Sequence, residues 1–183
     1  MKNATKKLAG SALFAALSVV LARLFGLMPE ASMRFSIEAV PLFLGGACFG
    51  PLYGAMIGFV ADFVGCLFSG YVYNPIFCLP PILYGVCGGL MALLFRKDMR
   101  LWKIAVGYLP PVLLGSIFWQ SFTLASVYGD PEATLWESYL YFLTTRSIQF
   151  AVTYVVDVAV TWILCRSNLF YKMGYLPKWK KKV

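Results

Sequence analysis

The sequence predicts an all-helical integral membrane protein, folded as a single bundle of about six transmembrane helices. Apolar residues make up 60% of the chain and charged residues only 13%, and the mean hydropathy is +0.73. Soluble domains carry roughly a quarter charged residues, so this composition cannot supply a water-facing surface. Apolar runs of about 20 residues, the length that crosses a bilayer, recur along the chain. We therefore expect residues 1–183 to form one membrane domain.

Six apolar segments account for this prediction, and glycine, proline or charged residues separate them. We expect helices over residues 8–27, 37–49, 52–68, 76–95, 102–127 and 139–165. The pair Gly50–Pro51 predicts a tight turn between the second and third segments. The proline pairs at 80–81 and 110–111 predict a kink or an unwound turn inside the fourth and fifth segments, because proline removes a backbone donor.

The basic residues predict the orientation of the bundle. Of the 16 lysines and arginines, 13 lie within residues 1–7, 96–103 and 166–182. Because basic residues stay on the cytoplasmic side of a membrane, six crossings place both basic ends, residues 1–7 and 167–183, in the cytoplasm. The opposite side is expected to carry a polar loop before the last helix, with Asp130, Glu132 and Glu137.

Several function classes are excluded or disfavoured by what the sequence contains. The net charge of +8 comes from basic residues that flank apolar runs, which favours lipid headgroup contacts over nucleic-acid binding. The chain has no histidine, and its five cysteines lie in apolar stretches, so we expect no metal site and no histidine-based catalysis. No G-x-x-x-x-G-K-[S/T] motif occurs, so ATP would have to be used by a partner. We expect no cofactor.

Ionisable residues within or beside the apolar segments are functional candidates, because burying charge in lipid is costly. They are Arg23, Arg34, Glu38, Asp62, Arg146 and Asp157. Asp62 is the strongest of these functional candidates, because it lies in the middle of the apolar run GFVADFVG. An alternative stays open, in which Asp62 with Arg146, or Arg23 with Asp157, form ion pairs that only lock the bundle.

Small residues follow one face of the first segment, at Ala9, Ala12 and Ala16. Small residues four apart let another helix approach closely in lipid. Glycines recur in the same way through residues 54–89. Either internal packing or docking of a separate membrane partner would explain these faces, and the first segment is where we expect a partner.

Aromatic residues cluster before the fourth segment, at Tyr71, Tyr73 and Phe77. Aromatic rings collect at membrane interfaces, which is one explanation. The other is that they stack on a flat organic ligand held near Arg34 and Asp62.

These features occur in an order that resembles a known family. The stretch MRFSIEAVPLFLGGACFGPLYGAMIGFVADFVG, followed by SGYVYNPIFCLPPILYGVCGGL, is similar to the substrate-binding S components of energy-coupling factor (ECF) vitamin transporters. It most resembles the folate-specific FolT branch. The matching features are Arg34 with Ser36, Pro41, the turn at 45–51, Asp62 and the aromatic run 71–77. The resemblance covers residues 8–95 well, whereas the loop before the fourth helix departs from the usual pattern.

The resemblance implies a high-affinity vitamin-binding subunit of an importer, not an enzyme, in the plasma membrane of a bacterium. Such a subunit captures its vitamin outside and delivers it inward with a coupling membrane subunit and two ATPases. The alanine face would then contact the coupling subunit. The implied substrate-binding residues are Arg34, Ser36, Asp62, Tyr71, Tyr73, Phe77 and Arg146.

Folate chemistry suggests a role for each of these groups. The carboxylate of Asp62 suits the adjacent N–H donors on the pyrimidine edge of a pterin, and the aromatic residues suit its flat face. Arg34 and Arg146 suit the anionic glutamate tail, because a guanidinium offers paired donors to a carboxylate.

Three alternatives remain open. The vitamin could be riboflavin, pantothenate or a pyridoxine-like compound. A small membrane enzyme acting on lipid is a second class, although it would need clustered carboxylates for a metal. A structural assembly factor is a third, and it would tolerate neutral residues in place of Arg34 and Asp62.

Overall fold

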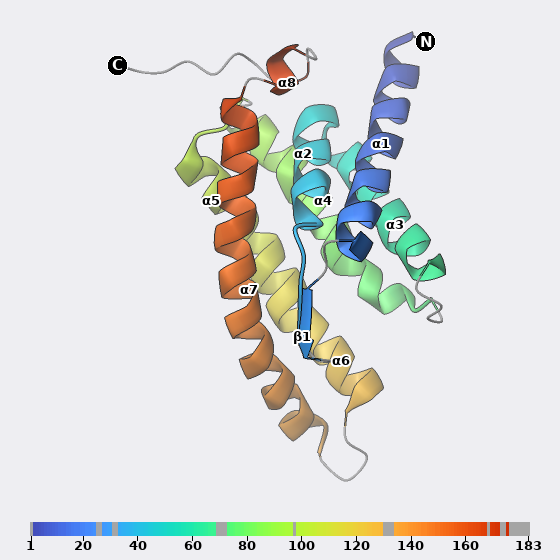
Figure 1. Cartoon of the computed structure of the whole chain (residues 1–183), viewed down its shortest axis with the longest axis vertical. Coiled ribbons are helices and arrows are strands. Elements are labelled where there is room, and N and C mark those ends of the chain that lie inside the picture. The colour runs from blue at the N-terminus through green and yellow to red at the C-terminus, as the bar shows by residue number, and fades with distance from the viewer. Residues whose placement is uncertain are drawn as a thin grey trace.

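The protein is a bundle of helices with one short hairpin (Figure 1). We analysed a computed structural model, which describes residues 2–24, 27–30, 33–68, 73–96, 98–129, 134–167, 169–172 and 175. The helical elements are α1 (Lys2–Leu24), α2 (Ala39–Phe49), α3 (Pro51–Leu67), η1 (Pro75–Cys78), α4 (Leu79–Leu94), α5 (Leu101–Pro110), η2 (Pro111–Trp119), α6 (Gln120–Tyr128), α7 (Leu135–Arg166) and α8 (Leu169–Lys172).

The helices coincide with the apolar segments that the sequence predicts. Four of them are long and apolar enough to cross a membrane, over Ala4–Arg23, Pro75–Leu94, Leu101–Tyr128 and Leu135–Arg166. The other two predicted segments form the shorter apolar helices α2 and α3. The all-helical class is thus confirmed, and four of the expected six segments have the length of a membrane span.

A short antiparallel hairpin between α1 and α2 is an addition to the predicted helices. Its strands are β1 (Leu27–Glu30) and β2 (Met33–Phe35), and Leu27 pairs with Phe35. The first helix therefore ends at Leu24, whereas the sequence predicts that it continues to Leu27. Pro29 explains the difference, because proline cannot continue a helix but is tolerated in a short edge strand.

The turn between α2 and α3 forms as predicted. Gly50 has a φ of 105°, a left-handed conformation that glycine adopts without steric cost. Pro51 then begins α3, where its missing N–H would have no partner in any case. The two helices consequently fold back on each other within a single residue.

Glycines bring α2, α3 and α4 into backbone contact. A Cβ atom added at Gly46 or Gly54 would overlap the carbonyl oxygen of Gly85, and one added at Gly88 would overlap that of Phe43. Close approach of this kind needs residues without side chains. With the exception of Gly65, the glycines of residues 54–89 therefore serve internal packing rather than a partner.

The two proline pairs mark changes in helix type. Pro80 and Pro81 lie in the first turn of α4, directly after the 3-10 turn η1, so the prolines cost no helical hydrogen bond. Pro110 and Pro111 separate α5 from η2, which is a π-helix. The fifth segment thus stays helical throughout and widens at the position where the sequence predicts a kink.

The last long helix begins earlier than predicted. Thr134 and Glu137 form a capping box, in which the Thr134 backbone N–H donates to Glu137 Oε2 at 2.8 Å. Glu137 therefore lies in the first turn of α7 rather than in the preceding loop. A carboxylate there also interacts favourably with the helix dipole. Asp130 and Glu132 lie outside the described residues.

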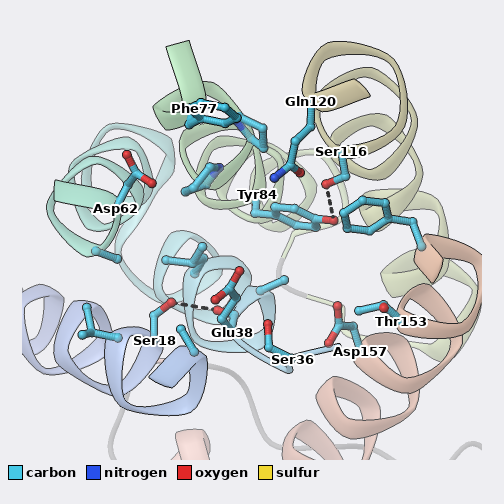
Figure 2. Close-up of a pocket in the computed structure, with 18 of the residues that line it drawn as sticks. Ser18, Ser36, Glu38, Asp62, Phe77, Tyr84, Ser116, Gln120, Thr153 and Asp157 are labelled. Atoms are coloured by element: carbon cyan, nitrogen blue, oxygen red, sulfur yellow. Dashed lines mark hydrogen bonds between the residues drawn. The ribbon is translucent and has the colours of Figure 1, made fainter. Parts of the chain in front are cut away.

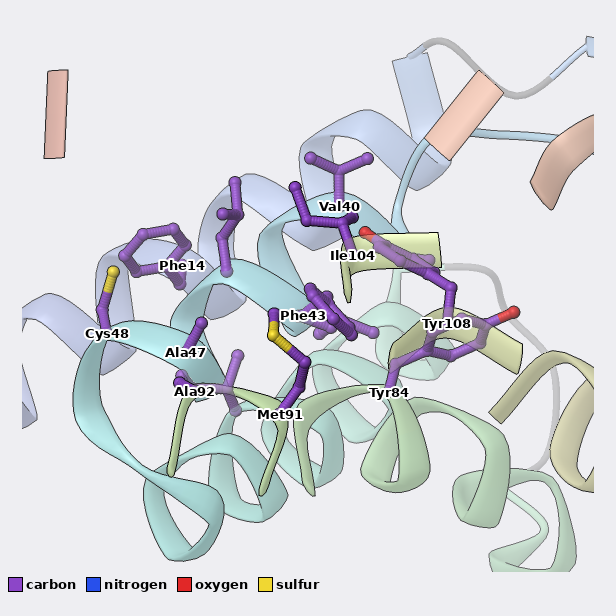
Figure 3. Packing of buried hydrophobic residues seen from close by; sticks show 14 of the residues in the cluster. Phe14, Val40, Phe43, Ala47, Cys48, Tyr84, Met91, Ala92, Ile104 and Tyr108 are labelled. Atoms are coloured by element: carbon purple, nitrogen blue, oxygen red, sulfur yellow. The ribbon is translucent and has the colours of Figure 1, made fainter. Parts of the chain in front are cut away.

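The hydrophobic core lies between α2, α4 and α5 (Figure 3). Phe43 and Tyr108 stack with ring centroids 4.1 Å apart, and the Tyr108 hydroxyl is hydrogen-bonded to Thr161 of α7 at 2.8 Å. The start of α1, α5 and the end of α7 lie at one end of the bundle (Figure 1). The cavity described next lies beside this core, and Tyr84 belongs to both.

Candidate substrate-binding cavity

A cavity of about 260 Å³ lies where α1, α2, α3, α4, η2 and α7 converge. Its wall combines apolar and polar side chains, and the polar ones come from helices far apart in the sequence (Figure 2). A concave site with a few converging polar groups is the usual form of a small-molecule site. The cavity is therefore the candidate functional site.

Three carboxyl groups line this cavity from different helices. Glu38 precedes the first residue of α2, Asp62 lies on α3, and Asp157 lies on α7. Asp62 and Asp157 stand on opposite sides of the cavity, with Glu38 between them (Figure 2). Asp157 is only 1% exposed, so its position is set by packing rather than by solvent.

Buried oxygen atoms of two of these carboxyls have no hydrogen-bond partner among the described residues. They are Oδ2 of Asp62 and both carboxylate oxygens of Asp157. A buried polar atom without a partner costs free energy, about 1–3 kcal/mol in proteins. Such atoms persist where function requires them, and here they face a cavity.

Hydrogen bonds hold the surrounding wall in place. The Ser18 hydroxyl of α1 donates to the backbone oxygen of Glu38 at 2.9 Å. The hydroxyls of Tyr84 and Ser116 lie 3.0 Å apart in a buried hydrogen bond between α4 and η2. Both contacts join elements that the sequence separates widely, and both end at residues that line the cavity.

Two arginines also line the cavity, and neither forms the ion pair that the sequence left open. Arg23 donates to the backbone oxygen of Gly65, while the oxygens of Asp157 have no hydrogen-bond partner. Asp98, outside the cavity, forms ion pairs with Arg100 and Lys103.

Arg146 is half-buried on α7, and its guanidinium lies 5.9 Å from the ring centre of Phe150, which also lines the cavity. A cation over an aromatic ring is attracted by the ring's quadrupole. The charge of Arg146 is thus held at the cavity wall.

The aromatic residues predicted to bind a ligand divide into three cases. Phe77 lines the cavity. Tyr73 packs edge-on against Phe63, with ring centroids 5.2 Å apart, and does not line it. Tyr71 lies outside the described residues. The Trp119 indole N–H donates to the backbone oxygen of Ile76 at 2.9 Å, which ties η1 to η2 and holds the segment that carries Phe77.

Four predicted residues line one cavity: Ser36, Asp62, Phe77 and Arg146. Arg34 lies in β2, two residues before Ser36. Its side chain is not among the parts of the chain that the structure describes. Four further polar residues line the cavity that were not predicted from the sequence: Tyr84, Ser116, Gln120 and Gln149. Glu38 and Asp157 stand out in the sequence as ionisable residues within or beside apolar segments, and Asp157 as a possible ion-pair partner of Arg23, but neither was predicted to bind the substrate.

The predicted partner face of α1 points outward. Ser11, Phe14, Ala15 and Ser18 are buried against the bundle, whereas the predicted contact residues Ala9, Ala12 and Ala16 are exposed. This face is therefore not used for packing within the chain.

The fold matches solved structures over nearly its whole length. A crystal structure of FolT bound with folic acid superposes with a TM-score of 0.73, at 24% identity over 98% of this chain and 99% of that one. ThiT from Listeria monocytogenes gives a TM-score of 0.72, at 17% identity over 96% of this chain and 100% of that one. At these identities the comparisons establish the shared fold. The sequence matches no curated protein.

The family comparison is independent of those superpositions. Residues 6–170 match the family described as ECF transporter, substrate-specific component. Proteins of this kind are integral membrane subunits that bind vitamin substrates and work with a coupling subunit and ATPases; they are not enzymes. The chain therefore belongs to the substrate-specific components of ECF transporters.

Proposed function

We propose that this subunit binds folate, and that the cavity lined by Asp62, Arg146 and Phe77 receives it. The observation that carries the proposal is the combination of unpartnered carboxylate oxygens with an arginine and an aromatic ring around one cavity. Folate offers a counterpart for each group. The structural likeness to FolT bound with folic acid supports the same assignment.

The pterin ring matches the carboxyl side of the cavity. Its pyrimidine edge presents adjacent N–H donors, and the buried Oδ2 of Asp62 is an acceptor without a partner among the described residues. Charge-assisted hydrogen bonds of this type are about twice as strong as neutral ones. Phe77 would supply an aromatic contact to the flat ring.

The anionic glutamate tail matches the arginines. A volume of about 260 Å³ lies just below the range of about 300–1,000 Å³ usual for drug-sized ligands. We assign the ring system to the cavity and the tail to its margin. Arg146 and Arg34 would bind the tail carboxylates, and Ser36 the intervening part of the molecule.

Titration of the purified subunit with a vitamin panel tests the proposal. Folic acid, pteroic acid, thiamine, riboflavin, pantothenate and pyridoxine would each be measured by calorimetry and tryptophan fluorescence. We expect folic acid to bind with nanomolar to micromolar affinity, about −8 to −12 kcal/mol. Pteroic acid, which lacks the glutamate tail, should bind more weakly. Absence of folic acid binding, with binding of another vitamin, would reject folate and retain the subunit class.

The remaining features of the assembly are part of the same proposal. The chain would cross the plasma membrane of a bacterium six times, with both termini in the cytoplasm. It would capture its vitamin from outside and release it inward on a coupling subunit driven by two ATPases. The subunit itself would need no cofactor.

Enlarging the exposed alanine face should impair assembly without affecting vitamin binding. Ala12→Leu places a larger side chain where we propose that a helix of the coupling subunit approaches α1. We expect co-purification with the coupling subunit and the ATPases to fall several-fold, while the isolated subunit keeps its affinity for folic acid.

Ala151→Leu is the matched control, because Ala151 is also an exposed alanine on a long helix, α7. It should leave co-purification unchanged. Equal recovery of the complex with both variants would show that α1 is not the docking helix.

A further inference from the structure

A second cavity lies at the end of the bundle where α1 begins and α7 ends (Figure 1). It has a volume of about 390 Å³ and is bounded by the start of α1, the turn between α2 and α3, the last turns of α4 and Tyr175. Among the described residues, none lines both this cavity and the substrate cavity. The proposed binding of folate therefore does not account for it.

Small and aromatic side chains form the floor of this second cavity. Ala47, Phe49 and Ala92 line it and are buried. The Phe49 ring packs edge-on against Tyr175 with ring centroids 5.0 Å apart, and the Tyr175 backbone N–H donates to the backbone oxygen of Phe170 at 2.9 Å. The floor is thus apolar and fixed by packing, and it gains from being covered by apolar atoms of a ligand.

Two lysines stand at the rim of the same cavity. Lys6 and Lys7 both line it, and both are exposed on α1. The ammonium nitrogen of Lys7 lies 5.8 Å from the ring centre of Tyr53 on α3, an attraction that keeps its charge beside the turn between α2 and α3. None of the described lining residues is acidic. The rim consequently offers positive charge to an anionic ligand.

Exposed leucines border the lysines and the turn. Leu93 lines the cavity and is exposed, and so are Leu8, which follows Lys7 directly, and Leu52, two residues after Gly50. In a membrane protein such side chains contact acyl chains, which are as apolar as leucine. An anionic ligand at the rim would therefore have lipid-facing surface beside it.

We propose that this cavity binds the headgroup of an anionic phospholipid, with Lys6 and Lys7 on its phosphate and its glycerol backbone and first methylenes over the apolar floor. Basic pockets between membrane helices on the cytoplasmic side are typical headgroup sites. This end of the bundle is the one for which we propose a cytoplasmic location. A soluble phosphate would match the lysines but leave the floor uncovered, and a zwitterionic lipid would bring no net charge. The combination fits a lipid such as phosphatidylglycerol.

Native mass spectrometry of the full-length subunit tests the proposal. The subunit would be reconstituted in nanodiscs of equal parts phosphatidylglycerol and phosphatidylcholine, and the lipids that it retains on release would be identified. We expect phosphatidylglycerol to be retained at least about tenfold over phosphatidylcholine. In Lys6→Gln/Lys7→Gln this ratio should fall close to one. Folic acid binding should not change, because neither lysine lines the substrate cavity.

Arg166→Gln/Lys172→Gln is the matched control. It removes two exposed basic residues of α7 and α8 at the same end of the bundle, and neither lines the second cavity. The lipid ratio of this variant should stay as high as that of the unaltered subunit. An equal loss in both double variants would reduce the effect to general attraction by the basic end and overturn the site.

Two further outcomes would also contradict a lipid site. One is a rise in unfolding temperature with inorganic phosphate as large as the rise with phosphatidylglycerol, which would identify a site for a free ion. The other is unchanged lipid retention in Lys6→Gln/Lys7→Gln, and lower co-purification with the coupling subunit would then assign the lysines to that partner. A failure of folic acid binding leaves the lipid site intact, because the two cavities are separate.

Discussion

Substituting Gly54 by alanine is expected to destabilise the subunit severely, by about 3 kcal/mol or more. A Cβ atom at this position would overlap the carbonyl group of Gly85 and lie 2.9 Å from Cα of Gly46. Overpacking in a core usually costs about 1–3 kcal/mol. Here the obstacles are backbone atoms of two other helices, so no side chain can rotate away. Thermal unfolding in detergent, followed by fluorescence, measures the effect.

Gly65→Ala on the same helix is the control. The nearest atom to its added Cβ would be Nη2 of Arg23 at 3.5 Å, an ordinary contact. Because alanine favours a helix over glycine by about 1 kcal/mol, this variant should be as stable as the unaltered protein or slightly more so. Similar unfolding temperatures for both variants would contradict the backbone packing of α3 against α4.

Asp62→Asn is expected to weaken folic acid binding about 100-fold or more. The substitution keeps the size of the side chain but replaces an acceptor oxygen by an N–H₂ donor, which would face the donors of the pterin. Hydrogen bonds to charged groups contribute about 1.5–3 kcal/mol, and about 1.4 kcal/mol corresponds to a tenfold change in affinity. Calorimetry of the purified variant gives the ratio directly.

Asp98→Asn removes a carboxylate of the same kind far from the cavity, where it pairs with Arg100 and Lys103. The affinity of this variant for folic acid should be unchanged, because Asp98 does not line the cavity. Its stability should also change little, because surface ion pairs contribute at most about 1 kcal/mol. If Asp62→Asn binds folic acid within about threefold of the unaltered subunit, Asp62 has a structural role only.

The apolar composition, together with the glycine, proline and charged residues that separate the apolar runs, was sufficient to locate the helices, because a lipid environment demands long apolar segments. The hairpin at residues 27–35 was missed for a physical reason. A strand depends on its pairing partner more than on its own residues, and strands of four and three residues leave little pattern. Glu137 was misplaced because acidic residues suggest a loop, although they are equally suited to the first turn of a helix.

The candidate site was predictable only where charge interrupted an apolar run. Asp62 and Arg146 stand out for this reason, and both line the cavity. Ser116 and Gln120 are polar residues of kinds common in long helices, and their orientation toward the cavity depends on the π-helix η2. A π-helix shifts the faces of the residues that follow it, and a helical period read from the sequence cannot anticipate this shift.

The backbone contacts among α2, α3 and α4 divide the cavity wall into two parts with different freedom to change. Helices that touch through glycines form one rigid block, and a substitution there disturbs folding before it alters recognition. The opposite wall, built by η2, α6 and α7, has no such constraint at Gln120 of α6 or Thr153 of α7. Adaptation of this architecture to a new vitamin should therefore proceed by exchanging side chains on α7 and η2 while the glycine block stays the same.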